Sequence, residues 1–244
     1  MSFEKEIQER IAEISTNKLL TDSAHAFMEA SVEPKYSYNF SWMGRPIIQY
    51  PQDMLAMQEI LWEVKPDLII ETGIAHGGSL IFYASILELI ATCTGNEGKV
   101  LGIDIDIRPH NRKAIEEHPM YKRINMIQGS SIAPEIIEHV KEQAKGKKRI
   151  LVCLDSNHTH NHALAELEAY ASLTSVGSYC VVFDTLIEDM GADMYPDRPW
   201  GPGDNPKTAV WEYLKTHNEF EIDKSIQNKL LITVAPDGYL KRVR

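Results

Sequence analysis

The sequence predicts one α/β domain built on a doubly wound, mostly parallel sheet of seven strands, with a helical extension before it. From residue 51 onward, short apolar runs alternate with helix-like segments, which is the pattern of βαβ units. The runs are almost continuously apolar, as expected of strands that are covered on both faces. No repeat or linker divides the 244 residues, and this length suits a single α/β core.

The elements follow in order along the chain. Near-helical apolar spacing predicts a helix over residues 4–20, and the aromatic-rich stretch 37–50 predicts a folded loop whose rings either pack over the core or line a cleft. Residues 1–50 are therefore assigned to a helical and aromatic extension. The predicted helices of the main domain are residues 53–64, 79–92, 111–118, 133–144, 160–173 and 206–217. The predicted strands are residues 67–71, 99–104, 124–128, 149–155, 178–183, 220–222 and 229–234.

Composition narrows the classes of function. Lys+Arg is 25 and Asp+Glu is 35, which gives a formal net charge of −10, and so acidic a surface disfavours nucleic-acid binding. Three cysteines without a C-x-x-C pair argue for a reducing compartment. The N-terminus is charged where a signal peptide needs an apolar run, and the apolar stretch 80–90 is too short to span a bilayer. We expect a cytoplasmic protein without a membrane span.

The first predicted strand ends in a glycine-containing loop, Glu71-Thr72-Gly73-Ile74-Ala75-His76-Gly77-Gly78-Ser79. Ligands of open parallel sheets bind beyond the carboxyl ends of the strands. Ala75 stands where a nicotinamide dinucleotide fingerprint needs glycine, and no Gly-Lys-Ser/Thr follows, which excludes a P-loop. The spacing resembles the S-adenosylmethionine loop of class I methyltransferases. The alternative is a plain strand–helix turn.

The next two strand ends supply further candidates. Asp104 can accept both ribose hydroxyls of an adenosine, whereas Asp106 is a helix cap or a solvated charge. Ser130 can touch the adenine edge, or the serines of this turn, Ser131 in particular, cap the following helix.

Asp155 and Asp184 follow the fourth and fifth strands, which lie side by side in such sheets. Two carboxylates converging in one cleft repel each other unless a cation lies between them, and oxygen ligands suit Mg²⁺ or Mn²⁺. One of the two could instead cap a helix or pair with a lysine. We expect His158 to face the cleft as a general base, and His160 and His162 to be exposed first-turn residues.

The chain resembles the cephalosporin hydroxylase family, which also holds rhamnosyl O-methyltransferases, over about residues 40–240. The resemblance rests on four motifs. They are Gly44-Arg45-Pro46-Ile47-Ile48-Gln49-Tyr50-Pro51-Gln52-Asp53, Pro66-Asp67-Leu68-Ile69-Ile70-Glu71-Thr72-Gly73 with Gly77-Gly78-Ser79, Leu154-Asp155-Ser156-Asn157-His158, and Arg198-Pro199-Trp200-Gly201-Pro202-Gly203.

This resemblance implies an S-adenosylmethionine-dependent methyltransferase with a divalent cation, and residues 51–244 as a Rossmann-like class I methyltransferase domain. Asp155 and Asp184 would hold Mg²⁺. Relatives can carry a Glu-Asp pair where this chain has Phe183-Asp184, so the metal site lacks one expected carboxylate. Either Glu188, Asp189 or water replaces it, or the affinity for the metal falls or the metal is absent. The cofactor-binding candidates are Glu71, Gly73, Ile74, Gly77, Ser79, Asp104, Ser130 and Asp155.

The expected activity is methyl transfer to a hydroxyl of a sugar in a surface polysaccharide or glycolipid, or of a natural-product small molecule. His158 and Asp155 would be catalytic, and the loop over residues 185–205, with Tyr195 and Trp200, would close over the acceptor. The alternatives are a hydroxylase or oxidoreductase of antibiotic-like substrates, and a non-catalytic accessory subunit. The apolar N-terminal helices suggest a homo-oligomer.

Overall fold

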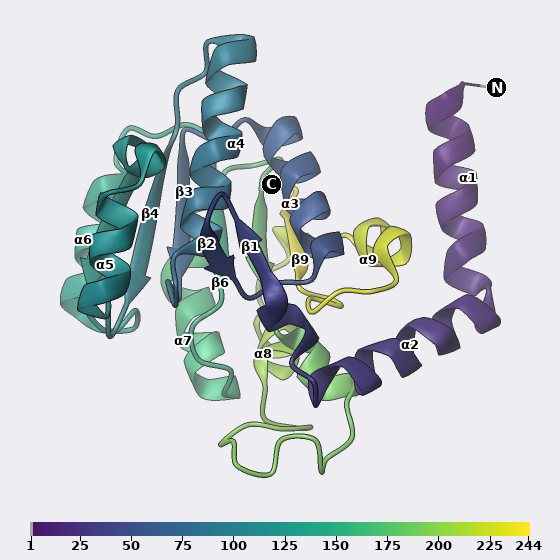
Figure 1. Cartoon of the computed structure of the whole chain (residues 1–244). Helices are drawn as coiled ribbons and strands as arrows, with labels where there is room; N and C mark the ends of the chain where they lie inside the picture. The colour runs from purple at the N-terminus through teal and green to yellow at the C-terminus, as the bar shows by residue number, and fades with distance from the viewer. Residues whose placement is uncertain (1) are drawn as a thin grey trace.

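The computed structural model describes residues 2–244, and a seven-stranded sheet forms its middle layer (Figure 1). The strand order is β5-β4-β3-β6-β7-β9-β8. The first five strands of this order are parallel, whereas β9 runs antiparallel to both of its neighbours. The strands are β3 (Leu68–Thr72), β4 (Lys99–Asp104), β5 (Ile124–Gln128), β6 (Ile150–Leu154), β7 (Tyr179–Val182), β8 (Phe220–Ile222) and β9 (Tyr239–Arg242).

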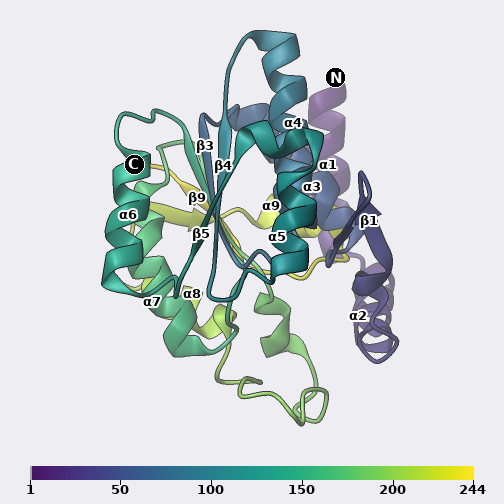
Figure 2. The same ribbon diagram turned by 60° about the vertical axis from the view of Figure 1, so that its left-hand side comes forward.

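Helices cover both faces of the sheet, as Figures 1 and 2 show. One face packs against α3 (Pro51–Val64), α4 (Gly78–Thr94), α5 (Pro109–Glu116) and α9 (Lys224–Leu230). The other face packs against α6 (Pro134–Ala144), α7 (His160–Tyr170) and α8 (Pro206–Tyr213). Residues 2–244 also contain four short 3₁₀ helices: η1 (Tyr36–Asn39), η2 (Pro119–Arg123), η3 (Ala171–Leu173) and η4 (Thr185–Asp189).

The central strands are buried along their whole length, which explains their continuously apolar sequences. Successive side chains of a strand point to opposite faces. In β3, Ile69 therefore joins the core on the α3–α4 side, while Leu68 and Ile70 join the core on the α6–α7 side. The predicted fold class, a doubly wound sheet of seven strands with N-terminal helices, is confirmed.

Two helices, not one, begin the chain. The predicted helix over residues 4–20 is interrupted at Asn17, which separates α1 (Phe3–Thr16) from α2 (Lys18–Val32). The extended backbone of Asn17 ends α1, and its side chain accepts a hydrogen bond from the backbone N–H of Leu20 at the start of α2. Asparagine favours such capping positions, so its side chain determines the break.

The aromatic stretch 37–50 is not a loop, as predicted, but contains a β-hairpin of β1 (Phe40–Trp42) and β2 (Arg45–Ile47). Met43 and Gly44 form the two-residue turn, both with positive φ (47° and 84°). This backbone twist matches that of the flanking strands. The hairpin packs on α4, where Trp42 Nε1 donates a hydrogen bond to Ser85 Oγ at 2.9 Å.

The predicted strand 229–234 is wrong, because its first residues complete α9 and the last strand is β9. A short apolar run does not by itself distinguish a strand from a buried helix end. Asp223 caps α9 by accepting from the Ser225 N–H. The buried Asp53 carboxylate binds the Thr233 hydroxyl and the Val234 N–H, which removes these groups from sheet pairing.

The other predicted elements of the main domain are present, with ends displaced by at most a few residues. Among residues 2–244, no helix is both long and apolar enough to cross a membrane.

Candidate active site

A cavity of about 560 Å³ lies beyond the carboxyl ends of β3, β6 and β7. Several parts of the chain line it: the β3–α4 loop with the residues that follow β6, the N-terminal segment 31–50, the residues from Asp184 into η4, the late loop between η4 and α8, and Val234. Its position agrees with the rule that open parallel sheets bind ligands where their strands end.

The β3–α4 loop fits closely against the residue that follows β6. Gly73 has φ of 90°, and a Cβ built on it would lie 1.9 Å from the Asp155 carbonyl oxygen. Only glycine allows this approach. Gly73, Ile74 and Ser79 all line the cavity, so the loop lies where the glycine pattern predicted it.

Glu71 lies behind this loop and does not line the cavity. It is 1% exposed, and one carboxylate oxygen accepts a hydrogen bond from Ser79 Oγ at 2.9 Å. Burial raises the pKa of Glu71 to about 8, although the hydrogen bond from Ser79 acts in the opposite direction.

The Asp104 carboxylate binds the loop backbone. One oxygen accepts from the N–H groups of Ile74 and Ala75, at 2.8 and 3.2 Å, and the other accepts from the Asp106 N–H at 2.9 Å. Asp104 thereby fixes the conformation of the loop between β3 and α4, which is the candidate cofactor-binding loop. The structure does not bring Asp104, Gly77 or Ser130 to the cavity wall.

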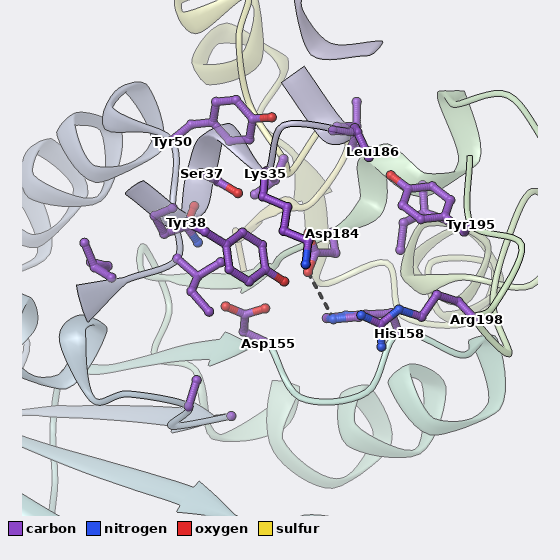
Figure 3. Close-up of a pocket in the computed structure, with 18 of the residues that line it drawn as sticks. Lys35, Ser37, Tyr38, Tyr50, Asp155, His158, Asp184, Leu186, Tyr195 and Arg198 are labelled. Carbon is purple, nitrogen blue, oxygen red and sulfur yellow. Dashed lines mark ion pairs between the residues drawn. The ribbon is translucent and has the colours of Figure 1, made fainter. Parts of the chain in front are cut away.

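Three polar side chains converge at the centre of the cavity (Figure 3). One ligand atom from each of Asp155, His158 and Asp184 lies within 4.8 Å of the others. His158 Nε2 lies 3.2 Å from Asp184 Oδ2. Burial, followed by the nearby charge of Asp184, raises the pKa of Asp155 well above its ordinary value.

This cluster fits a divalent cation. Two carboxylates that repel each other in a buried place are stabilised by a positive charge between them. Carboxylate oxygens are the ligands that Mg²⁺ prefers, and the imidazole of His158 lies beside them.

Four neighbouring side chains differ from the sequence prediction, because each already has a structural partner. His160 contacts Thr208 and Glu212, and His162 contacts Ser131, Ser156 and Glu166, so neither is the exposed residue that we expected. Glu188 accepts from Gly203 N–H and Asn205 Nδ2, and Asp189 pairs with Lys207, so neither replaces the carboxylate missing at Phe183.

The late loop supplies an aromatic wall. Trp200 stands edge-on to the His158 ring, with centroids 4.8 Å apart, and the Arg198 guanidinium lies 5.2 Å from the Trp200 centroid. Tyr195 also lines the cavity. The sequence analysis placed Tyr195 and Trp200 over the acceptor site, and their positions at the cavity agree with that expectation.

Sequence reasoning missed Lys35, Gln49 and Arg198 as lining residues. Gln49 is 9% exposed, and its Oε1 is buried without a hydrogen-bond partner among residues 2–244. A buried acceptor without a donor is uncommon in folded proteins. The family motif over residues 44–53, which contains Gln49, was a sequence signal for this residue. No motif contains Lys35.

The sequence matches the family model for rhamnosyl O-methyltransferase/CmcI over residues 34–243. The rhamnosyl O-methyltransferase of Mycobacterium tuberculosis is 35% identical over 210 residues, which are 83% of this chain and 78% of that protein.

Solved structures share the fold. CmcI with magnesium and S-adenosylmethionine matches 85% of this chain and 78% of its own, with a TM-score of 0.59 and 21% identity. A TDP-rhamnose 3′-O-methyltransferase of calicheamicin biosynthesis matches 91% of each chain, with a TM-score of 0.52 and 15% identity.

Proposed function

The chain belongs to the rhamnosyl O-methyltransferase/CmcI family, and from this membership we propose that it is an S-adenosylmethionine-dependent O-methyltransferase. It transfers a methyl group to a sugar hydroxyl with the help of a divalent cation. The observation that carries the proposal is the meeting of the Gly73 loop with the Asp155–His158–Asp184 cluster in one cavity.

We assign cofactor binding to the loop between β3 and α4 and to the neighbouring strand ends. The close approach of Gly73 to Asp155 leaves no room for a side chain. Gln49, which lines the same cavity, is an addition to the predicted set. Of that set, we assign Gly73, Ile74, Ser79 and Asp155, which line the cavity, whereas Glu71, Gly77, Asp104 and Ser130 do not reach its wall.

We assign the metal to Asp155 and Asp184. A bound Mg²⁺ lowers the pKa of a coordinated hydroxyl and orients it. His158 is assigned as the general base, because its imidazole lies beside Asp184 and within the cavity. The chain's own contribution is alignment of the acceptor oxygen with the methyl group, which can supply on the order of 7–11 kcal/mol.

The acceptor that we propose is a sugar of a surface polysaccharide or glycolipid, or a glycosylated small molecule. We also propose a cytoplasmic location, supported by the free thiols of Cys153 and Cys180 in the core. A homo-oligomeric state is proposed because Phe3 and Leu19, on the N-terminal helices, are 68% and 77% exposed.

Calorimetric titration with S-adenosylmethionine tests the cofactor assignment, and micromolar binding with competition by S-adenosylhomocysteine is expected. Methyl release from labelled cofactor, assayed with a panel of rhamnosyl acceptors, tests the reaction. Absence of heat and of competition would refute the cofactor assignment. Cofactor binding without methyl release on any acceptor would favour an accessory role.

Asp155→Asn tests the metal assignment. Loss of one carboxylate should lower metal-dependent turnover by roughly 100-fold or more, as expected when a main electrostatic stabiliser is removed. S-adenosylhomocysteine binding should remain, because the cofactor loop approaches the backbone carbonyl of Asp155, which the substitution leaves in place. The control is Asp106→Asn, because Asp106 is an exposed carboxylate that follows strand β4, away from the cavity. Full turnover of the wild type in chelator would remove the metal from the scheme.

A further inference from the structure

Two basic side chains line the cavity of this acidic protein. Lys35 reaches in from the segment before η1, and Arg198 reaches in from the late loop on another side (Figure 3). Within residues 2–244, neither forms an ion pair with a carboxylate. By contrast, the buried Lys207 nearby is paired with Asp189 at 2.6 Å. Lys35 and Arg198 are therefore available to a ligand.

Each of the two cations is backed by an aromatic ring. Lys35 Nζ lies 5.9 Å from the Tyr38 centroid, and the Arg198 guanidinium lies 5.2 Å from the Trp200 centroid. Such contacts favour a cation over a ring face without using its N–H donors. Both side chains are thus oriented while their donors remain free.

The backbone of Lys35 is fixed as well. Its N–H donates to the Val32 carbonyl, and its carbonyl accepts from the Tyr38 N–H and from Asn39 Nδ2, at 3.0 to 3.1 Å. The residue has φ of 52°, a region that lysine rarely adopts. These bonds determine the direction in which the side chain leaves the chain.

A divalent cation would offset the two negative charges of Asp155 and Asp184, so that these carboxylates would not repel an anion. Glu33 and Asp197 also line the cavity and are exposed to solvent, as Lys35 and Arg198 are, so the four charges are screened alike. Recognition of an anion therefore depends on the free N–H donors of Lys35 and Arg198 and not on a net positive charge of the lining. Hydroxyls of Ser37, Tyr38 and Tyr195 add uncharged donors to the same walls.

We propose that Lys35 and Arg198 bind a phosphate of the acceptor, so that the substrate is a sugar linked to phosphate or diphosphate and not a neutral glycoside. This inference rests on the proposed function. Arginine pairs with phosphate through two parallel N–H groups, and lysine acts as a point charge. A soluble nucleoside diphosphate sugar and a lipid-linked diphosphate sugar present the same group.

Binding of thymidine diphosphate is the first test, measured by calorimetry on full-length enzyme saturated with S-adenosylhomocysteine, with the same excess of Mg²⁺ in cell and syringe so that the charges of Asp155 and Asp184 are offset and the probe is already complexed with metal. Lys35→Ala and Arg198→Ala should each weaken binding about tenfold, the effect of losing one charge-assisted hydrogen bond. Inorganic pyrophosphate should compete, because the phosphates and not the nucleoside are recognised.

Lys65→Ala is the matched control. Lys65 also has positive φ (49°), and its Nζ lies 5.1 Å from the Trp62 centroid, but it does not line the cavity. The Lys65→Ala variant should bind thymidine diphosphate with the affinity of the wild type. Equal binding by all four proteins, or no binding by the wild type, would overturn the inference.

Methyl transfer is the second test. With TDP-rhamnose, the Lys35 and Arg198 variants should show a KM raised about tenfold and a nearly unchanged kcat, whereas methyl α-rhamnoside should show no such difference. A comparison of TDP-rhamnose with a short polyprenyl diphosphate rhamnose distinguishes a nucleotide-linked from a lipid-linked acceptor. The natural type of acceptor should have the higher kcat/KM.

A wild-type enzyme that uses methyl α-rhamnoside as efficiently as either phosphorylated sugar would contradict the inference but not the proposed function. If S-adenosylhomocysteine gives no heat at the start of these titrations, the proposed function itself fails.

Discussion

Glu71 shows how a single residue can couple the site to pH. Its carboxyl is buried behind the cofactor loop and has a pKa of about 8 instead of 4.5. Between these values the folded protein keeps a proton that the unfolded chain releases. The free energy of unfolding therefore falls as pH rises through this range, since the folded state binds more protons.

Glu71→Gln should reduce this dependence, because the amide keeps the shape and the bond from Ser79 but does not titrate. Denaturant unfolding of the ligand-free protein at pH 5, 6.5 and 8 measures it, and the wild type should lose a few kcal/mol across the range. Asp53, with a pKa of about 6, acts in the same direction, so the pH dependence of the free energy of unfolding should decrease in Glu71→Gln without vanishing.

The control is Glu9→Gln, because Glu9 is exposed, and it should leave this pH dependence unchanged. A Glu71→Gln protein whose stability falls with pH as steeply as that of the wild type would contradict the assignment of the effect to Glu71.

Side chains at strand ends were predictable one by one, whereas side chains from the extension and the late loop were not. Asp155 and Asp184 follow recognisable strands, so the topology alone brings them together. Lys35 and Arg198 enter from segments whose course depends on tertiary packing. The role of Asp104 was also hidden, because a sequence does not show that backbone N–H groups will occupy a carboxylate.

The β3–α4 loop is the element on which the site depends most. Its contact with the residue after β6 predicts that Gly73→Ala abolishes cofactor binding and destabilises the fold. Gly95→Ala is the control, because Gly95 also has positive φ but open space around it.

Gly95→Ala should cost about 1–2 kcal/mol, the penalty of a left-handed backbone with a Cβ. Gly73→Ala should cost roughly 1–3 kcal/mol more, from the forced overlap. Thermal and denaturant unfolding give these values, and calorimetry gives cofactor affinity. Equal costs for the two variants would show that the loop can move away from Asp155.

Elements with strong periodicity were predicted well, and elements that depend on partners were not. Strands β4, β5 and β8 agree with the prediction residue by residue. The hairpin β1–β2 was missed because two strands of three residues are too short for a periodic signal and form only against α4. The segment after α9 was wrongly predicted to be a strand, because the carboxylate of Asp53, far away in sequence, accepts the hydrogen bonds of Thr233 and Val234.

At the scale of the whole molecule, the division between an extension over residues 1–50 and a domain over residues 51–244 remains a proposal. Helix α1 packs on α2 and α9 and contributes nothing to the cavity wall. The segment after it is bound to the core, since the buried Ser31 and Tyr50 share a hydrogen bond of 2.6 Å.

Two truncations test this division. A chain that begins at Lys18 should keep S-adenosylhomocysteine affinity, whereas a chain that begins at Pro51 should lose it, because Gln49 and the hairpin are removed. Light scattering on the shorter deletion also tests whether α1 carries self-association. Loss of binding on removing α1 alone would extend the catalytic unit to the N-terminus.

Burial along the cavity has a kinetic consequence. Ile74 and Ser79, which we propose to bind the methyl donor, are more enclosed than Lys35, Tyr38 and Arg198, which we propose to face the acceptor. With both substrates in one chamber, an acceptor at the outer half would block the way to the inner half. We therefore expect turnover in a compulsory order, in which the methyl donor enters first and its spent form departs last.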